Sequence, residues 1–397
     1  MSDEARVEGS VAPGFEAVAE QFRRNFEERG DLGAAFAAVC RGEPVVDLWG
    51  GTADSLEGRP WARDTPQIIF SGSKGLVSMC ILLLLERQQL DLDRRVAYYW
   101  PEFAAAGKER VLVRDVVAHT ARLPGIDTPI TWQQATDDRM VAGLLAAQPQ
   151  SADPRAATAY HSLTFGWLCG ELVRRVDGRS IGRFFAEELA QPLALDIWIG
   201  LPPELQPCIS RVELTPTWGS RALSAEQLDA DALARAVANP LRYRPPDAFP
   251  WNEPAWHAAE VPAANAIGTA RSIARLYASL GQVFSPGTLE RARTPHSSRM
   301  DLLNNRWNSF GIGFQLQTDE LVLGPPGDAF GHGGAGGSLH GCWPTQGTGF
   351  SYAMNLLCDD STTDHRGAAL LDALYRSLQV ARPEAVASQI STAPGMK

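Results

Sequence analysis

Hydrophobic and polar positions follow two different periods in the N-terminal part of the chain. Apolar side chains first recur every three or four residues, at Phe15, Val18, Phe22 and Phe26. This spacing predicts an amphipathic helix that begins after a Pro-Gly pair. Two apolar runs follow, Ala34–Cys40 and Val45–Trp49, and the four residues between them include glycine and proline. These runs predict a β-hairpin.

A longer apolar segment, Leu76–Leu85, is hydrophobic nearly all round. A helix with no polar stripe is typical of the centre of a protein rather than its surface. The strand-like stretch Gln67–Phe70 comes just before it. We therefore expect the chain to turn at residue 71 and Ser71 to open a buried helix.

The middle of the chain, from about Val111 to Leu280, is mostly helical in pattern, most clearly at Phe165–Val176 and Ala270–Leu280. Strand patterns return before a last helix: Phe310–Leu316, Ser338–Trp343, Phe350–Leu357 and then helix Gly367–Leu378. Strands at both ends predict one sheet built from both termini, with a helical lobe inserted between them. Ser71 falls at the seam of the two parts, where ligand clefts are common.

Composition and charge place the chain among globular proteins. Its 397 residues, 45% of them hydrophobic, allow a large core and two lobes. The net charge of -10 argues against nucleic acid or an anionic membrane as a partner. Six scattered cysteines have no zinc-like spacing, so we expect free thiols and no metal. No secretory signal or membrane-spanning run is evident, which favours a cytoplasmic protein.

Lysine is rare in this chain, because only Lys74, Lys108 and Lys397 are lysines among 36 basic residues. Lys108 lies in a polar stretch and Lys397 is the last residue, so we expect both to be solvated. Lys74 instead adjoins the apolar segment, where a lysine can lose its proton and act as a base. Ser71 stands three residues earlier, on the same face of a helix. Ser-x-x-Lys therefore indicates a serine nucleophile.

Each candidate residue also has a structural explanation. Ser71 and Ser162 precede helices and could be N-caps. Tyr160 could be a partly buried tyrosine held by its hydroxyl, or a phenol that carries a proton from Ser71 to a leaving group. For His119, before a Pro-Gly turn, we favour a role in tying the turn to neighbouring backbone.

The segment from Gly331 to Ser338 contains five glycines and His332. Glycines this dense either form a flexible turn or let backbone N–H groups approach a ligand. The stretch also matches G-x-G-x-x-G, but no helix pattern follows it and no acidic residue stands about 20 positions on, so a dinucleotide-binding oxidoreductase is a remote alternative. The run Gly336-Gly337-Ser338-Leu-His340 resembles the nucleophile elbow of α/β-hydrolases, but its final glycine is missing.

These motifs together resemble those of a known superfamily. Ser71-Gly-Ser-Lys74, Tyr160-His-Ser162 and His332-Gly-Gly334 occur in the order of the three active-site motifs of serine β-lactamases and penicillin-binding proteins. Three further segments are similar to sequences of that superfamily: His119–Pro124, Pro192–Asp196 and Asn265–Arg271. The resemblance covers about residues 15–378 and is closest to class C β-lactamases and the family VIII carboxylesterases.

The resemblance implies an α+β fold: a five-stranded antiparallel sheet flanked by N- and C-terminal helices, with an inserted all-helical lobe. We expect residues 1–70 and 290–397 to form the sheet domain and 71–289 the helical domain. Ser71 would be the acyl nucleophile, Lys74 its activator and Tyr160 the proton relay. The backbone N–H groups of Ser71 and Ala335 would form the oxyanion hole. The implied substrate-binding residues are Ser162, His332, Gly333 and Gly334.

Two departures from the β-lactamase pattern favour a neutral ester substrate. Ser162 stands where those enzymes usually carry asparagine, and His332 where they carry the lysine of Lys-Thr-Gly. A mostly neutral imidazole holds a substrate carboxylate less well than a fixed cation does. We therefore predict a carboxylesterase for small or medium acyl chains, with no cofactor. Four tryptophans either line an apolar acyl pocket or are core packing: Trp132, Trp218, Trp251 and Trp256.

Other functions remain open. An amide-directed relative (a β-lactamase, D-aminopeptidase or amidase) and an acyltransferase would use the same acyl-enzyme. A non-catalytic binding module on this fold would have no need for Lys74 in an apolar site. The expected partner is a small-molecule ester, and the oligomeric state is open.

Overall fold

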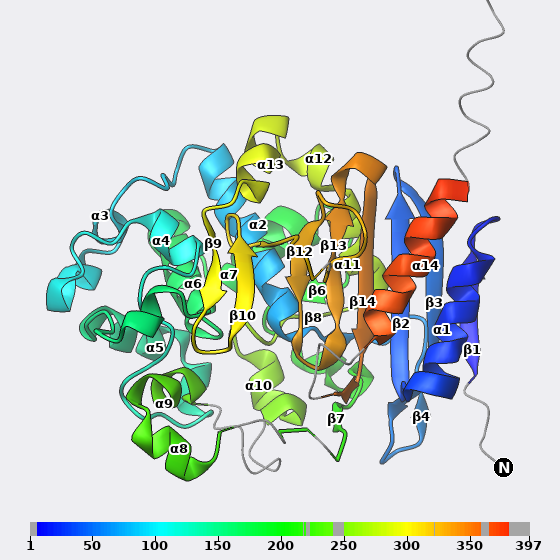
Figure 1. Cartoon of the computed structure of the whole chain (residues 1–397), viewed down its shortest axis with the longest axis horizontal. Helices are drawn as coiled ribbons and strands as arrows, with labels where there is room; N and C mark the ends of the chain where they lie inside the picture. Colours follow the sequence, from blue (N-terminus) through cyan, green and yellow to red (C-terminus); the bar gives the residue numbers. More distant parts are fainter. Residues whose placement is uncertain are drawn as a thin grey trace, which may run out of the picture.

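The computed structural model describes residues 6–216, 218–219, 223–240, 250–320, 322–358 and 365–380. Its main feature is an antiparallel sheet that contains strands from both ends of the chain (Figure 1). In spatial order the strands are β1 (Val7–Val11), β3 (Glu43–Asp54), β2 (Gly33–Cys40), β14 (Thr348–Met354), β13 (Leu339–Trp343), β12 (Phe330–Gly333), β11 (Gln315–Leu316), β10 (Arg306–Phe310) and β9 (Ser297–Asp301), and β4 (Arg59–Pro60) pairs with β3. The sheet assembled from both termini is confirmed.

The main sheet has ten strands among the described residues, so the expected number of five was wrong. The extra strands lie mostly at the two edges, where one or both faces are open to solvent. Strand β1, for example, exposes three of its five residues, and β9 exposes its three middle residues. Such strands lack the apolar alternation by which a half-buried strand is recognised in a sequence.

The predicted strand Phe310–Leu316 is two strands, β10 and β11, joined by a tight turn. Gly313 in that turn has φ 73°, a left-handed conformation that favours glycine, and Phe310 pairs with Gln315 across the hairpin. The predicted hairpin between β2 and β3 is confirmed, with a register shift at Ala38/Val39. The predicted strand Phe350–Leu357 ends at Met354, and β15 (Leu356–Leu357) continues it in another sheet.

Two small sheets accompany the large one. Strand β15 runs parallel to β7 (Glu213–Leu214), and β8 (Ile267–Gly268) pairs with both β5 (Gln67–Ile68) and β6 (Ile197–Trp198). The second sheet fixes the strand that leads into Ser71.

Helices cover both faces of the main sheet. Helices α1 (Glu16–Arg29) and α14 (Arg366–Val380) pack together on one face (Figure 1), and α11 (Ala270–Ala278) lies against β2, β13 and β14 on the other. The side chains between α11 and the sheet are small: Ala35, Ala37, Val39, Ala270, Ala274 and Ala353. Gly349 on β14 also lets α11 approach the sheet closely, because a Cβ atom at this position would lie only 2.4 Å from the Ala274 carbonyl oxygen.

Most remaining helices gather beyond the β9 edge of the sheet (Figure 1). The bounds of these helices, and of others that lie nearer to the middle of the sheet, are α3 (Val96–Tyr99), α4 (Val113–Val117), α5 (Asp138–Ala147), α6 (Thr164–Asp177), α7 (Ile181–Phe185), α8 (Ala225–Ala230), α9 (Ala232–Ala238), α10 (Pro254–Ala258), α12 (Leu280–Val283) and α13 (Pro286–Arg293). None of the helices in the described ranges is long and apolar enough to cross a membrane.

Helix α2 (Ser73–Glu86) runs through the centre of the protein, as its apolar sequence predicted. Every residue from Ser73 to Leu85 is buried. The helix contacts α6, α7, α13 and strand β12, so it joins the helical part to the sheet. Its start at Ser73 corrects the expectation that Ser71 opens it, because Ser71 lies in the preceding 3-10 turn, Phe70–Gly72.

Lys108 is buried, which contradicts the expectation that it is solvated. Its ammonium donates hydrogen bonds to the carbonyl oxygens of Ala105 (2.8 Å), Ala146 (2.9 Å) and Gln148. Three carbonyl acceptors take the place of water around the charge, so this lysine ties α5 to the segment before α4. Polar neighbours in the sequence do not reveal such a site. Lys397 lies outside the described residues.

Candidate active site

Ser71 occupies a tight turn between β5 and α2. The preceding residue, Phe70, has φ 49°, an unusual value for a bulky side chain, and Trp251 packs edge-on against its ring at 5.2 Å. The structural alternative for Ser71 does not hold, since the N-cap of α2 is Gly72 and no side chain caps this end. Ser73 is the structural serine: its Oγ accepts a hydrogen bond from Ala266 N at 2.9 Å.

Lys74 lies one turn further on and contacts Ser71 directly. Its Nζ is 3.0 Å from Ser71 Oγ and 3.0 Å from the carbonyl oxygen of Ala263. The side chain is fully buried, and this burial lowers the pKa of Lys74 well below its ordinary value. A neutral amine at this distance can accept the proton of Ser71 while one of its N–H bonds points to Ala263.

Tyr160 and His332, which are far apart in the sequence, meet beside Lys74. Lys74 Nζ is 4.9 Å from the centre of the Tyr160 ring, and Tyr160 Oη is 3.3 Å from His332 Nε2. Tyr160 comes from the loop before α6 and His332 from β12, which also contacts the Phe70–Gly72 turn. The tertiary structure thus brings together the three motifs that the sequence singled out.

Asp301 is a residue that sequence reasoning missed. Its carboxylate, at the end of β9, is fully buried and accepts a hydrogen bond from the backbone N–H of Tyr160 at 3.1 Å. It also accepts hydrogen bonds from the backbone N–H groups of Leu303 and Asn304 and from the side-chain amide of Asn304. A buried carboxylate satisfied in this way fixes the loop that carries Tyr160. A single aspartate before Leu-Leu-Asn-Asn gives no motif by which it could be recognised.

The glycine-rich segment after β12 lies against the Ser71 turn. A Cβ atom at Gly334 would sit 2.6 Å from the carbonyl oxygen of Ile69, so only glycine allows this approach. Ala335 follows in a short 3-10 turn, Ala335–Gly337, and is exposed. On the other side of Ser71, a Cβ atom at Gly72 would lie 2.4 Å from the ring of His340. The glycine-rich segment and the ring of His340 therefore both pack closely against the turn that carries the serine.

The remaining candidate residues from the sequence, which are Ser162, His119 and four tryptophans, differ in burial and in their distance from the serine turn. Ser162 is half-buried in the Tyr160 loop, and it does not cap α6, whose N-cap is Leu163. His119 ties its turn to neighbouring backbone as predicted, because its Nδ1 accepts the N–H of His161 at 3.1 Å. Trp256 is fully buried and Trp251 nearly so, whereas Trp132 and Trp218 are half-buried. Trp251 is in contact with the serine turn through Phe70.

Several histidines in and around this site are buried and neutral. Burial lowers the pKa of His161 to about 4, and that of His332 and His340 to about 3, each from 6.5. In the unfolded chain these imidazoles take up a proton near pH 6.5, whereas the folded protein excludes it until much lower pH. The unfolded state therefore binds more protons in this window, so stability is complete above pH 6.5 and decreases on acidification.

We expect the free energy of unfolding to fall below about pH 6.5 by roughly 1.4 kcal/mol per pH unit for each such histidine, or about 4 kcal/mol per unit for three. Urea denaturation at several pH values between about 7.5 and 5 measures this slope. Most carboxylates titrate at lower pH, so they contribute little to it. His340→Gln, which removes one of these groups, should reduce the slope by about 1.4 kcal/mol per pH unit. A free energy of unfolding that stays constant down to about pH 5 would contradict the prediction.

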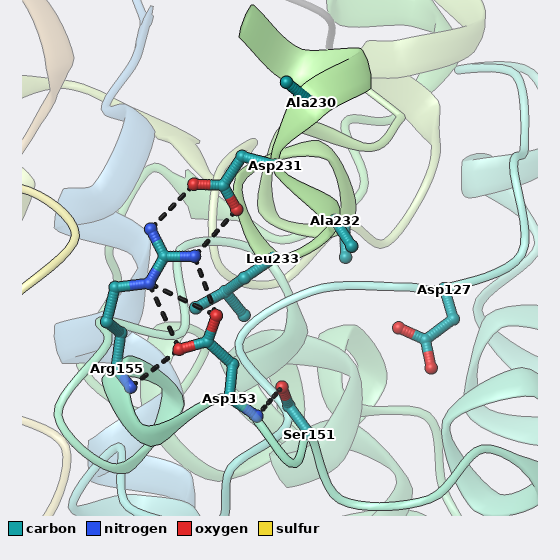
Figure 2. A pocket seen from close by; sticks show the side chains of 9 residues that line it. Asp127, Ser151, Asp153, Arg155, Ala230, Asp231, Ala232 and Leu233 are labelled. Carbon is teal, nitrogen blue, oxygen red and sulfur yellow. Dashed lines mark hydrogen bonds and ion pairs between the residues drawn. The ribbon is translucent and has the colours of Figure 1, made fainter.

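Two cavities, of about 440 and 660 Å³, lie elsewhere, and neither is lined by Ser71, Lys74 or Tyr160. In the smaller one, Arg155 bridges Asp153 and Asp231 while Asp127 points in from the opposite wall (Figure 2). This bridge ties α9 to the loop before Tyr160 and leaves no unpaired cation at the wall. Within the described ranges, no group of three or more His, Cys, Asp or Glu residues could hold a metal ion.

Several known proteins are similar to this chain along most of its length. A curated relative, the "Esterase/beta-lactamase LipL" of Mycobacterium tuberculosis (strain ATCC 25618 / H37Rv), is 33% identical over 91% of this chain and 86% of its own length. The crystal structure of a family VIII carboxylesterase matches 94% of this chain and 100% of its own, with a TM-score of 0.84 and 34% identity. A penicillin-binding protein homolog from Caulobacter crescentus covers the same shares with a TM-score of 0.83 and 33% identity.

The family model described as Beta-lactamase matches residues 22–374, which include the Ser71 turn, the Tyr160 loop and the glycine-rich segment after β12. Relatives with more than 30% identity along most of the chain support the same family assignment. The chain belongs to the Beta-lactamase family.

Proposed function

We propose that this protein is a carboxylesterase that works through an acyl-enzyme on Ser71. The observation that carries the proposal is the contact between Ser71 Oγ and the fully buried Nζ of Lys74, 3.0 Å apart. A lysine held without its proton beside a serine hydroxyl has little structural use, but it is what activation of a serine requires. The esterase names of the relatives support the same reaction.

In the proposed reaction, Ser71 Oγ attacks the ester carbonyl carbon and its proton passes to Lys74. The backbone N–H groups of Ser71 and Ala335 stabilise the oxyanion, and one such donor is typically worth roughly 3–4 kcal/mol of barrier. Tyr160 supplies a proton to the departing alcohol. Water then attacks the acyl-enzyme by the reverse sequence of proton transfers and releases the acid.

A neutral ester suits the site better than a substrate that carries a carboxylate. His332 stands where β-lactamases carry a fixed cation, and burial keeps it neutral, its pKa lowered to about 3. A neutral imidazole attracts a carboxylate much less than an ammonium does. Trp251 packs against Phe70, the residue before the serine, and we propose that the acyl chain is of small or medium length. The second candidate is β-lactam hydrolysis, which the name of the curated relative includes.

The test compares p-nitrophenyl butyrate with nitrocefin as substrates of the wild-type enzyme and of Ser71→Ala. We expect rapid hydrolysis of the ester, a kcat/KM for nitrocefin lower by at least about 100-fold, and loss of both activities in Ser71→Ala. Ser10→Ala, which removes an exposed hydroxyl on the edge strand β1, is the matched control and should keep the ester activity.

Two results would change the conclusion. Turnover of nitrocefin comparable to that of the ester would make β-lactam hydrolysis the main activity. Ester cleavage that survives in Ser71→Ala would mean that another group is the nucleophile. Transfer of the butyryl group to an added alcohol, in competition with hydrolysis, would show the acyltransferase reaction of the same acyl-enzyme.

A further inference from the structure

The hydrogen bonds of His332 define which of its ring nitrogens carries the proton. Nδ1 lies 2.6 Å from the carbonyl oxygen of Gly333, and a carbonyl oxygen only accepts hydrogen bonds, so Nδ1 must be protonated. A neutral imidazole has a single N–H, so Nε2 holds a lone pair. The atom that faces this lone pair, at 3.3 Å, is Oη of Tyr160.

His332 has no means of holding a second proton. Its side chain is 4% exposed, and this burial disfavours a positive charge on the ring and lowers its pKa to about 3. Near neutral pH, Nε2 can therefore only accept. Its partner Tyr160 has to be the donor, and only a protonated phenol can donate.

We propose that His332, as the neutral Nδ1–H tautomer, accepts the hydroxyl hydrogen of Tyr160 and so keeps Tyr160 a phenol in the resting enzyme. This deepens the proposed function and rests on it, because it divides the two proton-transfer roles between the two candidate residues. Lys74 is then the base that receives the proton of Ser71, and Tyr160 is the acid that protonates the leaving alcohol.

The proton transfers balance in this arrangement. As the bond from Ser71 Oγ to the carbonyl carbon forms, the serine proton moves to the neutral amine of Lys74. When the bond to the leaving alkoxide breaks, Tyr160 turns its hydroxyl from His332 to that oxygen and gives up the proton. The Lys74 ammonium then returns a proton to the Tyr160 phenolate, which restores both groups.

The residue type at position 332 decides whether Tyr160 is a phenol or a phenolate in the resting enzyme. A lysine there, as in the Lys-Thr-Gly motif that the chain lacks, would place a cation near the phenol oxygen and favour the phenolate, typically lowering a pKa by about 1–3 units. A neutral histidine that accepts a hydrogen bond favours the phenol instead. The exchange of lysine for histidine therefore changes the acid–base assignment as well as carboxylate binding.

The test uses NMR of the resting enzyme, so it does not depend on finding a substrate. The protein is labelled with ¹⁵N at histidine and ¹³C at the Cζ of tyrosine, and Tyr160→Phe identifies one resonance among the seven tyrosines. His332→Gln identifies the signals of His332. We expect a non-protonated Nε2 in His332 and a phenol at Tyr160 throughout about pH 6 to 9.

His332→Lys and His332→Gln form a matched pair that differs in charge. We expect Tyr160 to titrate about 1–3 pH units lower in His332→Lys than in His332→Gln. A protonated Nε2 in the wild-type protein, a tyrosinate at Tyr160 near pH 7, or equal titration of Tyr160 in the two variants would overturn the proposal. If the variants do not fold, the wild-type tautomer and the Tyr160 signal decide alone. Absence of ester turnover with these signals intact would reject the proposed function and leave the proton arrangement standing.

Discussion

Replacing Lys74 with arginine is expected to reduce kcat for p-nitrophenyl butyrate by roughly 10²- to 10⁴-fold, the usual contribution of a general base. Arginine keeps a positive charge but does not release its proton at any working pH, so it cannot accept the proton of Ser71. Lys74 Nζ lies 3.0 Å from Ser71 Oγ and is fully buried, so a fixed charge in its place also cannot escape to solvent. Steady-state rates and circular dichroism measure activity and folding together.

Lys74→Met is the matched control, because it has a similar length and no charge in the same apolar surroundings. It should fold at least as well as the wild type and be about as inactive as Lys74→Arg. Serine and lysine act as a unit, so combining either variant with Ser71→Ala should cause little further loss. If Lys74→Arg kept most of its activity, the proton acceptor would have to be Tyr160. The proposal that His332 keeps Tyr160 a phenol would then be wrong.

Replacing Arg366 with methionine is expected to lower the free energy of unfolding by about 3–5 kcal/mol, the usual effect of removing one partner of a buried ion pair. Arg366, at the start of α14, and Asp31, just after α1, are 1% and 0% exposed and 2.9 Å apart. The same carboxylate accepts the hydroxyl of Tyr352 at 2.7 Å. Removing the guanidinium leaves a buried carboxylate with much of its charge uncompensated.

Urea denaturation of Arg366→Met measures this loss. The double variant Asp31→Asn/Arg366→Met should recover part of it, because the charge left behind is also removed. A loss below about 1 kcal/mol would show that the pair is not important for stability. Arg366 also donates to the carbonyl oxygen of Gly336 at 2.8 Å, next to Ala335, so kcat for the ester should fall as well.

Those parts of the fold that bury a continuous apolar surface could be predicted from the sequence. The helix around Leu76–Leu85, the hairpin of β2 and β3 and the strands β13 and β14 all carry such a surface. Strands at the sheet edges were missed because they expose most of their residues, as β1 and β9 do. Burial of Lys108 was missed because its partners are carbonyl groups, which every residue has.

By itself, the sequence identified the three motifs that carry Ser71, Lys74, Tyr160 and His332. Rare residue types in unusual sequence surroundings can be recognised without knowledge of the fold. Lysine is such a residue here, with three among 36 basic positions. The helical spacing of Ser71 and Lys74 also predicted their contact, since a helix keeps residues three apart on one face.

Only the tertiary structure decided how these groups act on one another. Tyr160 and His332 are 172 positions apart, and their contact depends on where β12 lies relative to the loop before α6. The role of Asp301 depends on the same packing, as does the proton on His332, which follows from the direction of one backbone carbonyl. Hydrogen bonds are directional and short, so donor and acceptor roles exist only once the chain has folded.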